Sequence, residues 1–146
     1  MITQLKTSLA MFKNSPIPIW VNILLIFLLL PMVAQVYWFY FDHQFLVDAG
    51  ITTEGIPNLN IIYTTAGRLV AMIVISIFVL FTQNPNQMLI VLLMSIFREG
   101  QESFIDPLFP YANAAPAAMD IGMHVVIVAL EIWAFITVYR ITKKGE

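Results

Sequence analysis

The sequence predicts an all-α fold, an antiparallel bundle of four transmembrane helices with both termini in the cytoplasm. Hydrophobic residues make up 60% of the 146 residues and charged residues only 11%, whereas soluble proteins carry roughly twice that charge. Apolar stretches of the length that crosses a bilayer recur along the chain. The basic residues outside these stretches all lie on the side that the two termini share, which the positive-inside rule assigns to the cytoplasm: Lys6, Lys13, Arg140, Lys143 and Lys144.

The first helix is expected over residues 19–41, after a polar lead at residues 1–15 that suits a helix lying on the membrane surface. Trp20 marks one membrane interface, and an aromatic cluster at residues 37–40 marks the other. Pro31 predicts a kink, because proline removes a backbone hydrogen bond. We do not expect a cleaved signal peptide, because this apolar segment is too long for one and no small-residue cleavage site follows it.

The second helix is expected over residues 61–82, after a loop at residues 42–60 that contains acidic residues but no lysine or arginine. A short polar turn, QNPNQ, then leads to the third helix. Because this connection is so short, the second and third helices should be antiparallel neighbours.

The third helix, expected over residues 87–106, has an apolar first half and a polar second half, REGQESFID. If it continues to residue 106 it is about 30 Å long, which is enough to cross the hydrocarbon core. The alternative is a re-entrant segment. The fourth helix is expected over residues 117–139, which completes a single integral membrane domain over residues 1–146.

The composition excludes several kinds of chemistry. The chain has no cysteine, so thiolate catalysis, disulfide exchange, iron–sulfur clusters and thiolate metal sites are excluded. It has no basic patch suited to nucleic acid, and no phosphate-binding glycine loop, zinc-binding HEXXH motif or activated serine. We therefore assign no catalytic residue, and the cofactor stays unknown. The expected partner is the lipid bilayer, with a homo-oligomer and a larger membrane complex both left open.

Ionisable residues at membrane depth are the most informative feature. They share one face of each predicted helix: Arg68 on the second; Arg98, Glu99, Glu102 and Asp106 on the third; and Asp120, His124 and Glu131 on the fourth. Counting turns from the helix ends predicts two ionic layers. The outer layer holds Arg68, Glu99, Glu102 and His124, and the deeper layer holds Arg98 and Glu131. Asp106 and Asp120 are expected at the outer mouth.

The charges in these layers do not balance. A charged side chain in hydrocarbon costs roughly 2.5–3.5 kcal/mol on insertion scales, so it should face inward and be paired. Three deep acids stand against two arginines and one histidine, so a proton or a bound cation has to make up the difference. We interpret the cluster as a pocket for a proton, a cation or a small polar ligand. If the pocket binds a metal, the candidate ligands are Asp120, His124 and Glu102.

Three segments resemble the DoxX-like superfamily of small four-helix bacterial membrane proteins: GRLVAMIVIS, FREGQES and ALEIWAF, in the second, third and fourth helices. Families there often carry an arginine early in helix two, a polar or basic residue in helix three and a glutamate in helix four. Arg68, Arg98 and Glu131 stand at the matching positions. The resemblance covers about residues 15–140, although the acidic GQESFID stretch and His124 depart from the pattern. It implies a bacterial inner (plasma) membrane protein, and some members look like accessory parts of quinone-linked oxidases.

Two further functions stay open beside the pocket. In one, the chain is an accessory or structural subunit of a larger membrane complex, such as a respiratory one, and the ion pairs only fix helix packing. In the other, it is a membrane enzyme acting on a lipid-like substrate, with the buried acids as proton donors. The enzyme hypothesis predicts a lateral opening near Glu99 or Glu131.

Overall fold

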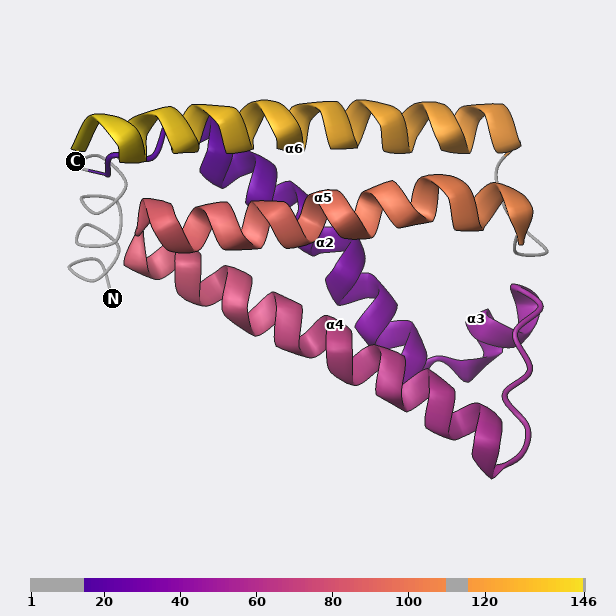
Figure 1. Ribbon diagram of the computed structural model, residues 1–146. Helices are drawn as coiled ribbons and strands as arrows, with labels where there is room; N and C mark the ends of the chain where they lie inside the picture. The colour runs from indigo at the N-terminus through magenta and orange to yellow at the C-terminus, as the bar shows by residue number, and fades with distance from the viewer. Residues whose placement is uncertain (1–14, 110–115, 146) are drawn as a thin grey trace.

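The computed structural model describes residues 15–109 and 116–145, and over these residues its regular structure is entirely helical (Figure 1). The elements are α2 (Ile19–Phe41), α3 (His43–Asp48), α4 (Ile56–Thr82), α5 (Pro85–Leu108) and α6 (Ala117–Gly145). The polar lead expected at the start of the chain lies outside the described residues, apart from Ser15. The four predicted long helices are therefore all present.

Within the described residues, three helices are long and apolar enough to cross a membrane: Ile19–Phe41, Ile56–Thr82 and Ala118–Lys144. Helix α5 does not reach this level of hydropathy, because its second half is polar. It is nevertheless one continuous helix of 24 residues, about 36 Å long at 1.5 Å per residue. The expected continuation through residue 106 is thus present, while the crossing of α5 as a fourth span stays a prediction.

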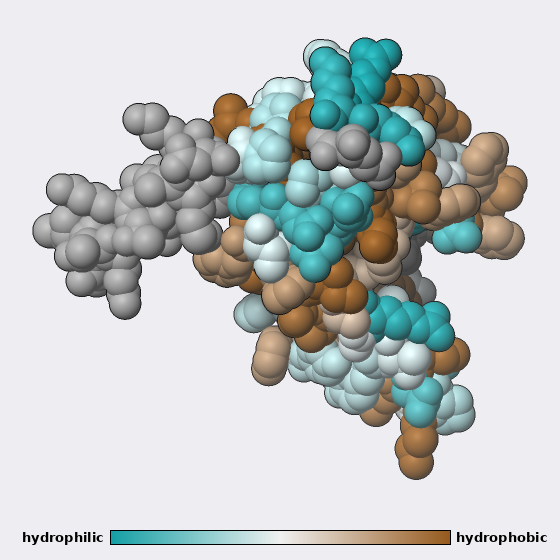
Figure 2. Space-filling view, turned by 60° about the vertical axis from the view of Figure 1, so that its left-hand side comes forward, coloured by the Kyte–Doolittle hydropathy of each residue, from teal (hydrophilic) through white to brown (hydrophobic). Residues whose placement is uncertain are grey.

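The surface has the character of a membrane protein. Many large apolar side chains on the long helices are exposed, among them Phe27, Phe78, Phe97 and Trp133. Figure 2 shows hydrophilic residues gathered at the end of the molecule that carries the α4–α5 turn and the end of α6, while hydrophobic residues cover much of the sides. A bilayer accounts for this arrangement, because exposed apolar patches of this extent are rare on soluble monomers.

The helices pack as two pairs. Helices α5 and α6 lie side by side along their length, and α2 packs on α4 (Figure 1). The first half of α2 reaches α6, where the ring centroids of Trp20 and Trp133 are 5.0 Å apart. The second half of α2 reaches α4, where the rings of Tyr40 and Tyr63 stack at 5.6 Å. Helix α2 therefore crosses from one pair to the other.

All four long helices meet in one core near the chain ends. Its fully buried residues include Leu25 of α2, Val79 of α4, Leu92 of α5 and Val138 of α6. Away from this core α4 diverges from α5, so that the two are close only near the turn that joins them (Figure 1). The bundle is consequently tight at one end and splayed at the other.

The tight end is closed by polar contacts at the α4–α5 turn, where the predicted antiparallel neighbours are joined. Gln83, at φ 50°, donates from Nε2 to the Asn22 side chain at 3.0 Å and accepts from Ser15 Oγ at 2.6 Å. Asn84 then caps α5 by accepting from two backbone amides of its first turn, and Pro85 suits the first helical position because it has no amide to satisfy.

The segment expected to be a loop at residues 42–60 contains a short helix, α3. The side chain of Asp42 accepts from the backbone amide of Phe45 and so caps the helix. The ring of Phe45 then stacks on Trp38 with centroids 4.1 Å apart. The loop prediction was wrong for α3. The contact between Phe45 and Trp38 holds this short helix against the end of α2.

Candidate functional site

A cleft of about 400 Å³ opens between α2, α5 and α6 in the splayed half of the bundle. Helix α2 lines it mainly with apolar groups and one amide, contributed by Phe27, Leu28, Pro31 and Gln35. Helices α5 and α6 bring six ionisable side chains to it: Arg98, Glu99, Glu102, Asp106, Asp120 and His124. Spacings of three and four residues place these side chains on the facing sides of the two helices.

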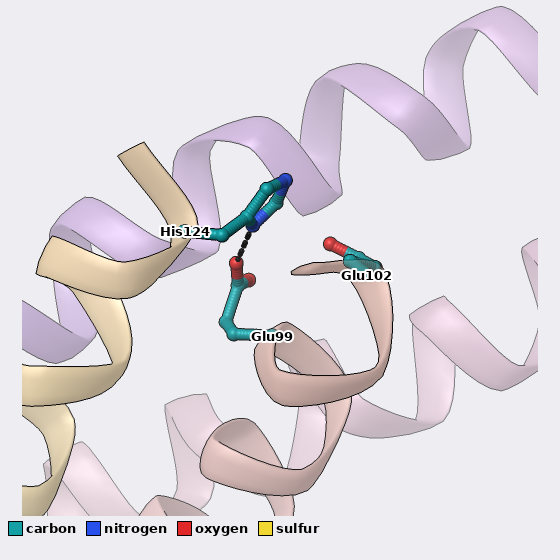
Figure 3. Close-up of side chains that lie close together, drawn as sticks. All are labelled: Glu99, Glu102 and His124. Atoms are coloured by element: carbon teal, nitrogen blue, oxygen red, sulfur yellow. Dashed lines mark hydrogen bonds and ion pairs between the residues drawn. The ribbon is translucent and has the colours of Figure 1, made fainter. Parts of the chain in front are cut away.

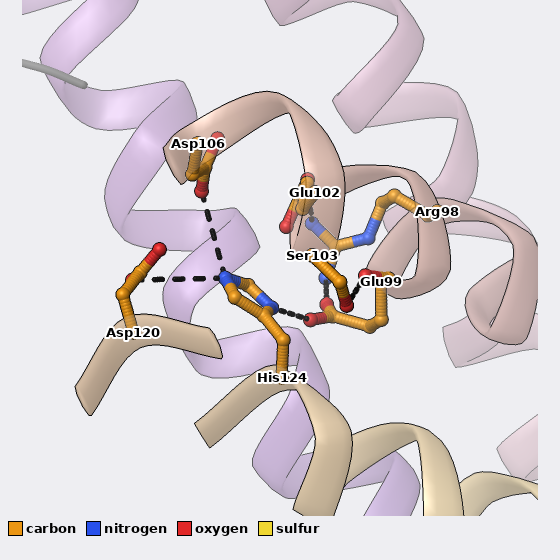
Figure 4. A network of polar contacts seen from close by, with 7 residues as sticks. All are labelled: Arg98, Glu99, Glu102, Ser103, Asp106, Asp120 and His124. Atoms are coloured by element: carbon orange, nitrogen blue, oxygen red, sulfur yellow. Dashed lines mark hydrogen bonds and ion pairs between the residues drawn. The ribbon is translucent and has the colours of Figure 1, made fainter. Parts of the chain in front are cut away.

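His124 lies at the centre of this cluster, with only 8% of its side chain exposed. Its Nδ1 is 3.0 Å from Oε2 of Glu99, and Figure 3 shows the ring reaching from α6 to the Glu99 carboxylate on α5. Its Nε2 faces the opposite way, 3.5 Å from Oδ2 of Asp106 and 3.8 Å from Oδ1 of Asp120 (Figure 4). One imidazole therefore joins carboxyl groups at two depths of the cleft.

Arg98 neutralises the inner part of the cluster. Its guanidinium forms ion pairs with Glu99 and, at 3.5 Å, with Glu102 one helical turn further along α5. The Glu99 carboxylate therefore accepts from Arg98 through one oxygen and faces His124 through the other. Ser103 adds a hydrogen bond of 2.9 Å to the Glu99 backbone carbonyl. Glu99 is buried, and its side chain is fixed from two directions.

The deeper ionic layer that the sequence predicted is not formed. Arg98 was expected beside Glu131, but its ion pairs are with Glu99 and Glu102. Glu131 is fully buried, and neither carboxyl oxygen has a hydrogen-bond partner within the described part of the chain. Arg98 instead turns along its own helix to Glu102, and its Nε is also buried without a hydrogen-bond partner among the described residues.

Arg68 also departs from the prediction that placed it in the outer layer. Its side chain is exposed on α4, and it forms no ion pair or hydrogen bond with any residue that the structure describes. Arg68 does not line the cleft. Helix α4 diverges from α5 toward its own first residues (Figure 1), and Arg68 lies on this diverging half.

The apolar part of the cleft wall on α2 was not predicted as part of the site. Pro31 has no backbone N–H, so the carbonyl of Phe27 one turn earlier loses its usual helical donor, and both residues line the cleft. Gln35, one turn after Pro31, adds an amide to the same wall. The available signal was a proline and a glutamine at helical spacing within an otherwise apolar span.

The cluster contains two groups of three side chains whose ligating atoms lie within 4.8 Å of one another. One group is Glu99, Glu102 and His124, and the other is Asp106, Asp120 and His124. The predicted metal ligands Asp120, His124 and Glu102 thus do not form one group, because Asp120 and Glu102 contribute to different ones. Imidazole and carboxylate are ligand types that divalent transition metals accept.

Comparison of the chain with models of protein families, with curated proteins and with solved structures finds no match.

Proposed function

We propose that this chain is an integral membrane protein that binds or translocates a cation in the cleft between α2, α5 and α6. The observation that carries the proposal is the charge of the cleft. Four carboxyl groups line it beside a single guanidinium and a single imidazole. Among the residues that the structure describes, Arg98 forms ion pairs with Glu99 and Glu102, and the carboxyl groups of Asp106 and Asp120 are left to be balanced in another way.

Ion pairs that only fixed the packing of α5 on α6 would not need this arrangement. Asp106 and Asp120 come from different helices and both face the same nitrogen of His124. Like charges brought together in this way repel each other unless a proton or another cation is shared between them. The cleft also has the size of a small-ligand site. Both points favour a binding site over a purely structural cluster.

The proposed topology places the cleft toward the outer side of the membrane. In this topology α5 also crosses the membrane, so the chain has four spans and both termini are cytoplasmic. The membrane is the inner (plasma) membrane of a bacterium, as in the DoxX-like superfamily. The basic residues near the end of α6 support this orientation. Asp106 and Asp120 lie near the opposite end of α5 and α6, so the mouth of the cleft would face the periplasm.

The test is the cation dependence of thermal unfolding for the full chain in lipid nanodiscs. Proton, Na⁺, K⁺, Mg²⁺ and Zn²⁺ concentrations are varied one at a time, because a ligand that binds only the folded state stabilises it by mass action. At least one of these cations should stabilise the wild-type protein. Glu102→Gln and His124→Asn should weaken that response, and Glu54→Gln, which changes an exposed carboxyl group outside the cleft, should leave it intact.

Unaltered cation responses in both Glu102→Gln and His124→Asn would contradict the proposal. Flux measured in proteoliposomes with an ion-sensitive dye then separates binding from translocation, since only translocation changes the internal concentration.

A second candidate function, an accessory subunit of a larger membrane complex, is favoured by Arg68. This arginine lies within a candidate span and is exposed, and its charge is costly at membrane depth unless it is paired. A carboxylate of another polypeptide would pair it. Purification in mild detergent should then recover a stoichiometric partner that Arg68→Ala releases and Arg140→Ala, at the chain-end side, retains. A monomer with the wild-type sequence would count against this function.

A further inference from the structure

We infer that the outer end of the cleft is a binding site for a divalent transition-metal ion, held by Nε2 of His124 and the carboxylates of Asp106 and Asp120. The inference rests on the proposed cation-binding function and names the ion class and its ligands. The proposed ligands are the outer group of three side chains. In the inner group, which shares His124, Glu99 and Glu102 already form ion pairs with Arg98.

The distances suit an ion shared between the three groups. Nε2 of His124 is 3.5 Å from Asp106 and 3.8 Å from Asp120, which is long for hydrogen bonds between these atoms. Two ligand atoms bound to the same metal at about 2.1 Å, with an angle between tetrahedral and about 130°, are roughly 3.4–3.8 Å apart. The observed spacings therefore need little movement to receive the ion.

The orientation of His124 supports the same assignment. Its Nδ1 lies 3.0 Å from Oε2 of Glu99, and Glu99 is held in turn by Arg98. When the proton of a neutral imidazole sits on Nδ1, facing Glu99, the lone pair of Nε2 is directed at two carboxylates, which are themselves acceptors, and a bound cation satisfies all three. A carboxylate that accepts from the second ring nitrogen is the usual support of a metal-bound histidine, because it fixes the tautomer and the ring orientation.

The ligand types indicate a transition metal. An imidazole nitrogen suits Zn²⁺, Mn²⁺, Fe²⁺ and similar ions, whereas Mg²⁺ and Ca²⁺ prefer ligands that are all oxygen. Two carboxylates neutralise one divalent ion, which lowers the cost of holding it near hydrocarbon. Three protein ligands leave coordination positions open toward the cleft of about 400 Å³, where water or a small anionic ligand can complete them.

The test uses the full chain in lipid nanodiscs, stripped of metal with a chelator and titrated calorimetrically with Zn²⁺. One ion should bind per chain. Asp106→Asn and Asp120→Asn should each abolish the binding, and Glu99→Gln should weaken it about 10–100-fold by removing the support of His124. Asp48→Asn and His43→Asn, which alter side chains on α3, are the matched controls and should bind as the wild type does. Thermal unfolding without metal shows that each variant is folded.

A second measurement needs none of the aspartate variants. The chain has two histidines, so in His43→Asn the one left is His124. Pulsed EPR of Mn²⁺ bound to this variant should show coupling to an imidazole ¹⁴N nucleus. Absence of that coupling, absence of Zn²⁺ binding, or Zn²⁺ binding that survives both aspartate substitutions would overturn the metal site. If the protein still responds to protons or Na⁺ through Glu102 and His124, the proposed function stands and only the metal inference falls.

Discussion

Nδ1 of His124 on α6 lies 3.0 Å from Oε2 of Glu99 on α5, so a buried carboxylate orients a buried imidazole across the interface between the two helices. The other side of that carboxylate faces Arg98. This chain of contacts connects the guanidinium on α5, through Glu99 and His124, to the two aspartates at the mouth of the cleft.

Removing the guanidinium should destabilise the protein strongly. In Arg98→Met the buried Glu99 loses its ion-pair partner, and breaking a buried pair costs about 3–5 kcal/mol. The free energy of unfolding in lipid nanodiscs measures the loss. The double variant Arg98→Met/Glu99→Gln should recover much of it, because no unpaired charge is left behind. Arg140→Met, at an exposed position, should change stability by no more than about 0.5 kcal/mol; a loss equal to that of Arg98→Met would contradict the assignment.

Glu131 should tolerate a neutral replacement of the same size. Its carboxyl oxygens have no hydrogen-bond partner within the described residues, so Glu131→Gln removes no ion pair and should change the free energy of unfolding by less than about 1 kcal/mol. Glu131→Ala should cost about 2–4 kcal/mol, because it leaves a cavity in a fully buried position. If Glu131→Gln were as damaging as Arg98→Met, the two residues would form the deeper ionic layer after all.

The polar contacts at the α4–α5 turn should contribute to stability independently of the cleft. Gln83→Ala removes the bonds of this side chain to Ser15, Asn22 and the Leu80 carbonyl. The buried Asn22 side chain then lacks its hydrogen bonds to Gln83, so we expect the free energy of unfolding to fall by about 1–3 kcal/mol. Gln44→Ala is the control, because its bond to Asp48 is exposed. Cation-dependent stabilisation should be the same in Gln83→Ala as in the wild type, and a change in it would show that the turn and the cleft are coupled.

The crossing of α5 can be tested with single cysteines, since the natural chain has none. Phe109→Cys, just after α5, and Thr52→Cys, before α4, should react with an impermeant maleimide added outside intact cells. Asn86→Cys, at the start of α5, and Lys144→Cys should react only after permeabilisation. If Phe109→Cys behaves like Asn86→Cys, α5 does not cross the membrane and the topology has three spans.

Local sequence determined the helices and their faces. Hydrophobic length and the polar segments between the apolar stretches predicted four long helices, and all four are present in the structure. The three- and four-residue spacings also placed Glu99, Glu102 and Asp106 on one side of α5, and Asp120 with His124 on one side of α6. These features follow from the periodicity of a single helix, so a sequence is sufficient to specify them.

Only the tertiary structure decided which charged groups meet. Arg98 turned along its own helix to Glu102, Glu131 was left without a hydrogen-bond partner in the described residues, and Arg68 faced outward. These outcomes depend on how α2 crosses between the helix pairs, on how far α4 diverges from α5, and on how far a long side chain carries its charge. Crossing angles arise from packing between residues far apart in the chain. The periodicity of a single helix therefore cannot predict them.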